Sequence, residues 1–131
     1  MVRVLISEKY KSTAMRLGVV LLAVFSFWRI TQAAECGEFD SLVKKREMYV
    51  PGADSERQVA GNGRLQFYSA PDVKCKMAGV FILPHQKIDA YYTYGYYTSV
   101  VYIDVKTGSN VSGWVRSNRL KSTGLGIAPR H

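Results

Sequence analysis

Residues 88–103 read "IDAYYTYGYYTSVVYI", and this stretch predicts a β-hairpin. Tyr94-Gly95 lies between two arms rich in aromatic and β-branched residues, and a glycine can supply the positive backbone angle of a tight turn. The stretch holds six of the nine tyrosines of the chain. Because a tyrosine joins a large apolar face to a hydroxyl that needs a partner or water, the cluster suits either the rim of a core or a binding face.

Shorter strands are predicted on both sides of the hairpin. The segments "RLQFYS" (64–69), "KMAGVFIL" (76–83) and "SGWV" (112–115) are separated by Gly, Pro, Asn and Ser, and "RSNRL" (116–120) forms a closing turn. Five short strands in about 58 residues imply an all-β domain, either a small barrel or two packed sheets.

Alternation along the strands predicts the core, because successive side chains point to opposite faces. Ile88, Ala90 and Tyr92 share one face of the first hairpin arm. In the second arm, the same rule groups Val101, Ile103 and Val105. The predicted interior consists of Leu65, Phe67, Ile82, Ile88, Val101, Ile103, Val115 and Leu120.

Residues 1–34 have the pattern of an export signal. Arg16 precedes the largely apolar run 17–28, and small residues follow it, which predicts cleavage after Ala33 or Ala34. The apolar run is shorter than the roughly 20 residues that span a bilayer, so no stable membrane insertion is expected after cleavage. Met15 is an alternative start to Met1. The predicted localisation is periplasmic or secreted.

The charge of the remaining chain argues against nucleic acid as a partner. The whole chain has a formal net charge of +8, but residues 35–131 hold 13 Lys and Arg against 9 Asp and Glu. The longest basic run there is Lys44-Lys45-Arg46, which is typical of a solvated face. An exported protein with so small an excess of positive charge offers little for a phosphate backbone.

Cys36 and Cys75 are the two cysteines of the chain, and an oxidising compartment makes a disulfide between them the expected state. The bond would tie the N-terminal extension, residues 35–62, onto the predicted barrel of residues 63–121. The residues of the extension fit neither a helical nor a strand period clearly, so its conformation stays open. Residues 122–131 are expected to form a C-terminal tail.

The barrel region resembles a known family, the bacterial SH3-like (SH3b) domains of exported and cell-wall proteins. The segment 65–71, "LQFYSAP", is similar to the first-strand motif L-x-V-R-S-x-P of that family. The segment 113–120, "GWVRSNRL", is similar to its final G-W-V, short turn and leucine. The resemblance covers residues 63–121 and implies an SH3-like barrel of about five strands, monomeric or weakly dimeric.

The chain also departs from that family. Tyr68 replaces the usual arginine, the tryptophan at the start of the long third strand is missing, and the hairpin is richer in tyrosine. The acidic loop of eukaryotic SH3 domains is absent, so recognition of PxxP ligands does not carry over. The resemblance implies a binding module that does no chemistry itself.

No convergent catalytic or metal-binding set is recognised in the sequence. His85 follows Pro84 in a turn, and His131 is the last residue. One usable histidine and two cysteines that are 39 positions apart make a poor zinc set. Ser69, His85 and Asp89 could be nominated as a triad, but no nucleophile motif surrounds the serine. A non-enzyme without a cofactor is therefore expected.

Two functions remain open. The first is an exported module that binds an envelope protein or a peptidoglycan peptide; the second is a periplasmic immunity or inhibitor protein that neutralises a toxin or a cell-wall hydrolase. Tyrosine and tryptophan give much contact area at little conformational cost, which is why they concentrate at binding hot spots. We predict a partner-binding face made of Tyr68, Tyr91, Tyr94, Tyr96, Tyr102 and Trp114, with Tyr92 and Tyr97 directed inward. Trp114 could instead cap the core.

Overall fold

A computed structural model of the chain describes residues 31–45 and 48–128. The chain divides into two compact units, Met1–Glu35 and Cys36–His131. Most of the predicted export signal, including Met1, Met15 and the apolar run, lies outside the described residues. Residues 31–43 are helical.

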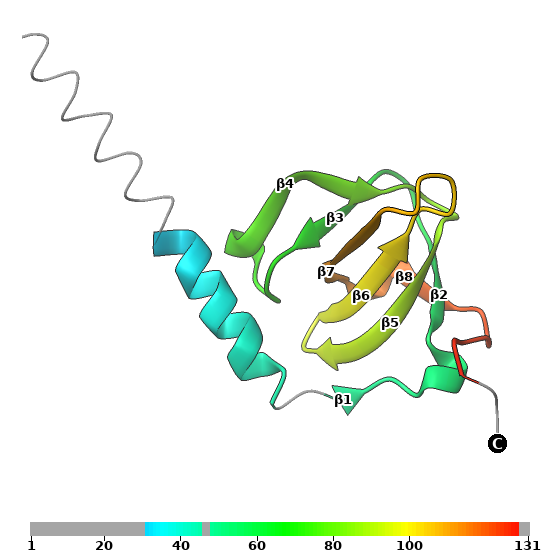
Figure 1. The fold of residues 1–131 in the computed structure, drawn as a ribbon, viewed down its shortest axis with the longest axis horizontal. Coiled ribbons are helices and arrows are strands. Elements are labelled where there is room, and N and C mark those ends of the chain that lie inside the picture. Colours follow the sequence, from blue (N-terminus) through cyan, green and yellow to red (C-terminus); the bar gives the residue numbers. More distant parts are fainter. Residues whose placement is uncertain (1–30, 46–47, 129–131) are drawn as a thin grey trace, which may run out of the picture. The chain divides into compact units, whose positions relative to one another are not determined.

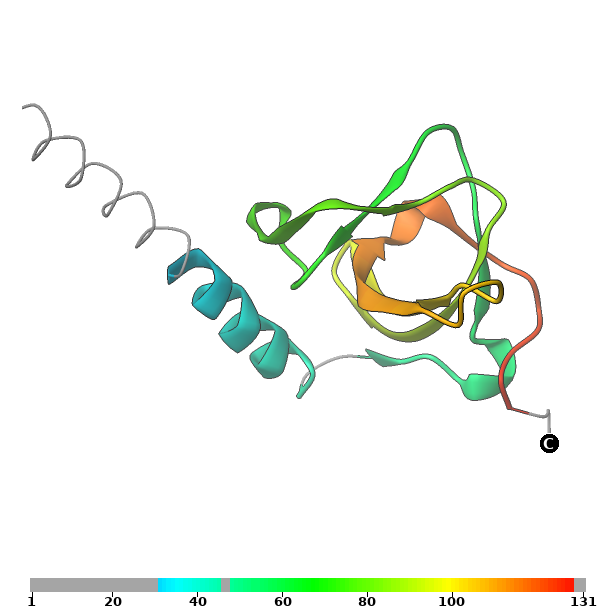
Figure 2. The same cartoon turned by 45° about the horizontal axis from the view of Figure 1, so that its top comes forward.

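The second unit is built on one antiparallel sheet that curls into a half-barrel (Figures 1 and 2). Its strands are β1 (Met48–Tyr49), β2 (Glu56–Val59), β3 (Leu65–Tyr68), β4 (Lys76–Ile82), β5 (Lys87–Tyr94), β6 (Tyr97–Ile103), β7 (Asn110–Arg116) and β8 (Leu120–Ser122). They lie in the order β4-β3-β7-β6-β5-β2-β8, and β1 pairs with β5. Three short 3-10 helices intervene: η1 (Gly52–Asp54), η2 (Val73–Cys75) and η3 (Ser117–Arg119).

The hairpin of residues 88–103 is confirmed as β5 and β6. The two strands pair from Asp89 opposite Val101 to Tyr94 opposite Tyr97. Gly95 closes the turn with a φ of 54°, which is the left-handed backbone that glycine adopts without a steric penalty. The register shifts between Ala90 and Tyr92, so one extra residue bulges out of β5.

The predicted inward face of the second arm is wrong by one residue. Val100, not Val101, is buried, because it lies directly opposite the buried Ala90. Ile103 is 54% exposed and Val105 is 91% exposed. Valines stand at both 100 and 101, so alternation fits the arm in either phase, and the pairing with β5 selects the phase.

The concave side of the sheet holds the inner cluster, to which every strand from β2 to β7 contributes a buried residue. Its members are Val50, Val59, Leu65, Phe67, Ile82, Ile88, Ala90, Val100 and Val115. The predicted burial of Leu65, Phe67, Ile82, Ile88 and Val115 is confirmed, and Leu120 packs against them half-buried. The inner cluster is thus a continuous apolar core.

Eight strands are present where five were expected, and the extra ones are β1, β2 and β8. β2 lies between β5 and β8 and pairs with both, so the predicted boundary between residues 62 and 63 does not bound the sheet. The sequence of β2, "ERQV", does not indicate a strand inside the sheet, because three of its four residues are polar. Its place depends on backbone pairing, which periodicity does not detect.

The C-terminal tail returns to the start of the sheet. The Glu56 amide donates to the Leu125 carbonyl at 2.9 Å, and the Ala128 amide donates to the Gly52 carbonyl at 3.2 Å. A Cβ at Gly126 would lie 1.9 Å from the Gly52 oxygen, so this close approach requires glycine.

The expected disulfide between Cys36 and Cys75 is confirmed. The S–S distance is 2.06 Å, and both cysteines are buried. Cys36 lies in the helix 31–43 and Cys75 ends η2, so the bond fixes one end of the helical segment 36–43 to the sheet.

Replacement of both cysteines by alanine should lower the free energy of unfolding by about 4 kcal/mol, because the bond closes a loop of about 40 residues in the unfolded chain. Chemical denaturation of the oxidised protein and of the double variant, followed by far-UV circular dichroism, measures the difference. Equal denaturation midpoints would contradict the structural role assigned to the bond.

Glu56 connects β2 to β5 and to the tail. Its carboxylate lies 3.0 Å from the Lys87 Nζ and accepts a hydrogen bond from the Thr123 hydroxyl at 2.8 Å. These two partners, Lys87 first, hold the pKa of Glu56 below its ordinary value. A carboxylate with a lowered pKa in the folded state stabilises the fold above the unfolded pKa, and this contribution is lost as the pH falls through the folded pKa.

Glu56→Gln should therefore lower the melting temperature at neutral pH, and the difference from the native protein should shrink on acidification to about pH 3. Thermal denaturation at both pH values measures it. Glu38→Gln, on an exposed position of the helix, is the matched control. A difference that is the same at both pH values would contradict the assignment.

Candidate functional site

The convex side of the sheet carries a second apolar cluster, covered by the helical segment 36–43. Val43, Tyr97 and Trp114 are buried in it. Phe39, Tyr68 and Tyr92 pack half-buried around these three. We call these six residues the outer cluster; two of the hairpin tyrosines, Tyr92 and Tyr97, belong to it.

Trp114 is held at the centre of the outer cluster. Its side chain is 1% exposed, and its indole Nε1 donates to the Asp40 carboxylate at 2.7 Å. Asp40 also forms an ion pair with Lys44 at 2.8 Å. Of the two places expected for Trp114, the structure has the buried one, because the helix of the extension covers this residue.

Tyr97 forms the boundary between the outer cluster and the solvent. It is 6% exposed, and the Tyr68 ring meets it edge-on at 5.3 Å between centroids. The Arg116 guanidinium lies over its face, 4.6 Å from the centroid. Burial raises the pKa of the Tyr97 phenol, and the nearby Arg116 charge opposes this shift in part. Tyr97 thus serves as a platform for Arg116.

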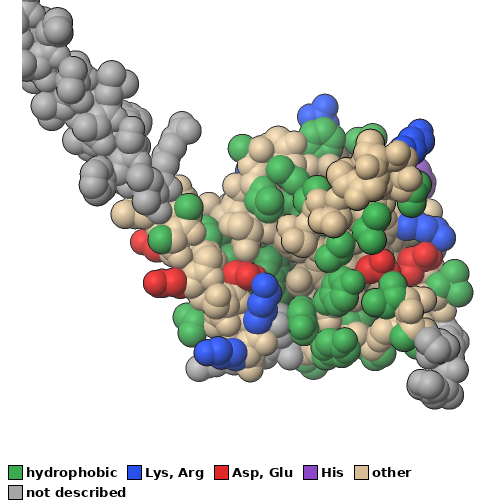
Figure 3. Space-filling view, viewed as in Figure 1, with side chains coloured by type: hydrophobic (Ala, Val, Ile, Leu, Met, Phe, Trp, Pro, Cys, Tyr) green, Lys and Arg blue, Asp and Glu red, His purple; other side chains and the backbone are tan. Residues whose placement is uncertain are grey.

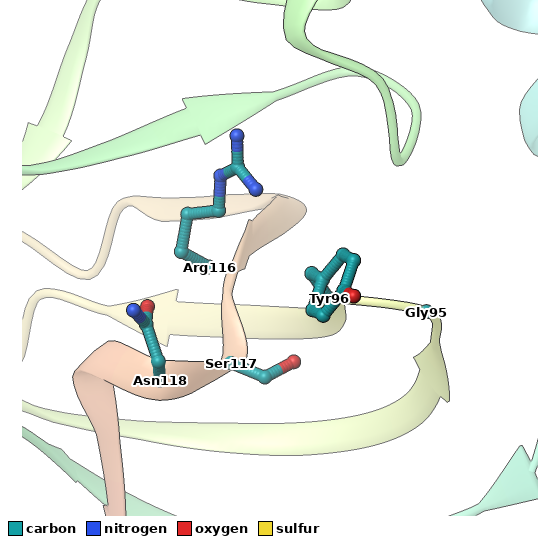
Figure 4. Close-up of a pocket in the computed structure, with 5 residues that line it drawn as sticks. All are labelled: Gly95, Tyr96, Arg116, Ser117 and Asn118. Carbon is teal, nitrogen blue, oxygen red and sulfur yellow. The ribbon is translucent and has the colours of Figure 1, made fainter.

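A hollow of about 490 Å³ opens beside this platform, at the β5–β6 turn (Figure 4). It is lined by Gly95, Tyr96, Arg116, Ser117 and Asn118. The Ser117 amide donates to the Tyr96 carbonyl at 2.9 Å, and its hydroxyl hydrogen-bonds the Thr98 hydroxyl at 2.8 Å. These bonds fix the walls of the hollow and leave the side chains of Tyr96, Arg116 and Asn118 around its mouth.

The hollow carries a positive charge. Among residues 31–45 and 48–128, no carboxylate lies within ion-pair distance of the Arg116 guanidinium. Ion pairs join Lys44 to Asp40, Arg57 to Asp54, and Lys87 to Glu56. Arg116 is half-buried against the Tyr97 ring, and the Asp72 carboxylate also acts electrostatically on that tyrosine.

The structure does not gather the predicted binding residues on one surface. Tyr96 is 81% exposed at the hollow, as expected. Tyr94 is also exposed, but it meets Phe39 edge-on at 6.2 Å, beside the helix. Tyr68 is half-buried in the outer cluster.

Two further tyrosines of the predicted face lie elsewhere. Tyr91 is half-buried at the β5 bulge, and its carbonyl accepts from the Val50 amide at 2.8 Å. Tyr102 packs half-buried against the inner cluster, where its hydroxyl accepts from the Gln86 Nε2 at 2.9 Å. Arg116 and Asn118 are not among the site residues predicted from the sequence. Alternation from Trp114 would have placed Arg116 on the convex side, but only the register of β6 with β7 puts it over Tyr97.

Two other surfaces carry exposed apolar side chains. Phe39, Leu42, Val43 and Tyr94 line a cleft of about 170 Å³ between helix and hairpin. Met48 and Tyr49 of β1 are exposed as well, and Tyr49 meets Tyr92 at 5.5 Å. Figure 3 shows hydrophobic side chains gathered over β1 and β5.

Neither a metal centre nor a membrane span is evident in the part of the chain that the structure describes. No group of three or more His, Cys, Asp or Glu is placed to share an ion within residues 31–45 and 48–128. His85 is exposed in its turn, and His131 lies outside the described residues. No helix of the described residues has the length and apolar character to cross a bilayer.

Comparisons with protein-family models, with curated proteins and with solved structures find no match to this chain. The evidence for the candidate site is therefore its geometry.

Asp40→Ala should remove the hydrogen bond from the Trp114 indole and lower the free energy of unfolding by about 1.5–3 kcal/mol, because a buried donor loses a charged partner. Trp114 emission should shift to the red. The measurement uses a Trp28→Phe background, in which Trp114 is the sole tryptophan of the chain. Glu38→Ala on the same helix is the control, and equal emission maxima in the two variants would contradict the bond.

Proposed function

We propose that this chain is an exported, non-catalytic binding module with an SH3-like architecture. It recognises an envelope protein or a cell-wall peptide through the hollow beside the β5–β6 turn. The observation that carries the proposal is the pairing of an exposed Tyr96 with an Arg116 guanidinium that has no acidic partner among the described residues.

Several features support the SH3-like architecture. The segment "GWV" lies in β7, just before its last residue Arg116; the short turn after the strand is η3, and Leu120 begins β8. The motif "LQFY" is β3, which pairs with β7 through Tyr68 and Trp114, so the two resembling motifs are neighbours in the sheet. The additional strands β1 and β2 are then supplied by the extension.

Export is supported by the buried disulfide, because a structural disulfide in a small domain is typical of an oxidising compartment. The segment 17–28 and the small residues after it supply the matching signal in the sequence. The proposed location is accordingly the periplasm or the exterior.

The proposed binding role follows from the residue types at the hollow. Tyrosine and arginine are enriched at interface hot spots, where a few side chains carry most of the binding energy. Tyr96 exposes most of its ring at the turn, and the Tyr97 ring holds the Arg116 guanidinium in place before any partner arrives. A positioned side chain loses little conformational freedom on binding, which favours affinity.

Tyr96→Ala should weaken partner binding by about 1–2 kcal/mol, which is about five- to thirtyfold in the dissociation constant, and leave the melting temperature unchanged. Binding is measured by sedimentation with purified peptidoglycan and by pull-down from envelope extract. Val105→Ala, an equally exposed position in the β6–β7 loop, is the matched control.

Loss of binding to peptidoglycan in Tyr96→Ala alone identifies a cell-wall ligand, and loss of one specific protein from the extract identifies an envelope partner. A Tyr96→Ala variant that retains native binding in both assays would overturn the site. A lowered melting temperature would instead assign Tyr96 to the fold.

A further inference from the structure

We infer that the hollow recognises a carboxylate carried by a peptide, with Arg116 as the residue that binds it. The inference rests on the proposed function and names the chemical class of its ligand. It is argued from the charge, the geometry and the size of the hollow.

The positive charge of Arg116 favours an anionic ligand in the hollow. Arg116 is the one ionised side chain among the five residues that line the hollow. An anion placed there would meet a half-buried guanidinium that forms no ion pair with a carboxylate of the described residues.

The geometry favours a carboxylate. The Arg116 Cζ lies 4.6 Å from the centroid of the Tyr97 ring. The N–H groups of a guanidinium form a planar fork that matches the two oxygens of a carboxylate. Sites for phosphate usually combine several cations or a series of backbone N–H groups. This hollow has one cation, and the Ser117 amide is already bonded to Tyr96, so a carboxylate fits better.

The size and the remaining walls favour a peptide over a small free acid. A volume of about 490 Å³ lies within the range of about 300–1,000 Å³ typical of sites for ligands far larger than one carboxylate. The Asn118 side chain offers both an amide donor and an acceptor, which can pair with a peptide group. Tyr96 adds an exposed ring for an adjacent side chain.

The carboxylate can come from a chain terminus or from an acidic side chain, and three short probes separate these sources. They are acetyl-Ala-Ala-Ala with a free carboxylate, the same peptide as the C-terminal amide, and acetyl-Ala-Glu-Ala-amide. Each is titrated into the oxidised protein while NMR records the Arg116 Nε–H and the Tyr96 amide.

We expect the free acid, the glutamate peptide, or both to shift these two signals, and the amide to bind at least about tenfold more weakly. The probe that binds names the source. Arg116→Gln should abolish the shift of the Tyr96 amide, whereas Lys106→Gln, which removes one exposed positive charge elsewhere, should preserve it. Arg116→Lys keeps the charge without the planar fork and should bind weakly. Equal binding of the amide would overturn the inference.

Amidation of peptidoglycan carboxyls with a carbodiimide separates this inference from the proposed function. If Tyr96→Ala weakens binding to native peptidoglycan or to an envelope partner but neither amidation nor Arg116→Gln does, the binding module stands and the carboxylate inference fails. If Tyr96→Ala and Arg116→Gln both leave all binding unchanged, both fail. Melting curves of each variant exclude loss of fold as the cause.

Discussion

The Cys36–Cys75 disulfide fixes the helix that covers the convex side of the sheet. It holds the helical segment 36–43 where Asp40 reaches the Trp114 indole and Val43 closes over the outer cluster. Beneath this cover, Tyr97 becomes a fixed platform, and Arg116 lies on it. The disulfide thus fixes the helix that covers Tyr97, the residue on which Arg116 lies.

Both faces of the tyrosine-rich hairpin contribute residues to an apolar cluster. Val100 and Ala90 fill the concave side, where they pack in the inner cluster with larger side chains such as Phe67. Tyr92 and Tyr97 fill the convex side, where their rings pack against the residues of one short helix. A tyrosine can bury its ring and still direct its hydroxyl to water or a partner, which suits a layer of this thickness.

Prediction from the sequence succeeded where a local signal was strong. The hairpin carries its own turn glycine, the cysteines have one possible pairing, and Leu65, Phe67, Ile82 and Val115 follow plain alternation. It failed where the signal was not local. The polar strand β2 is placed by backbone pairing with its neighbours. The bulge in β5 decides which residues of β6 face the core. Tyr96, Arg116 and Asn118 meet at the hollow because of the strand register, which sequence spacing does not indicate.

The position of β2 also bears on the order in which the domain assembles during synthesis. β2 lies between β5 and β8, and the Glu56 amide donates to the Leu125 carbonyl. A segment that is synthesised early therefore completes its pairing only after one of the last segments has been made. A chain that emerges N-terminus first can join Cys36 to Cys75 long before β8 exists, but its half-barrel stays open along β2 until residues 120–128 arrive. Oxidation can therefore precede closure of the sheet.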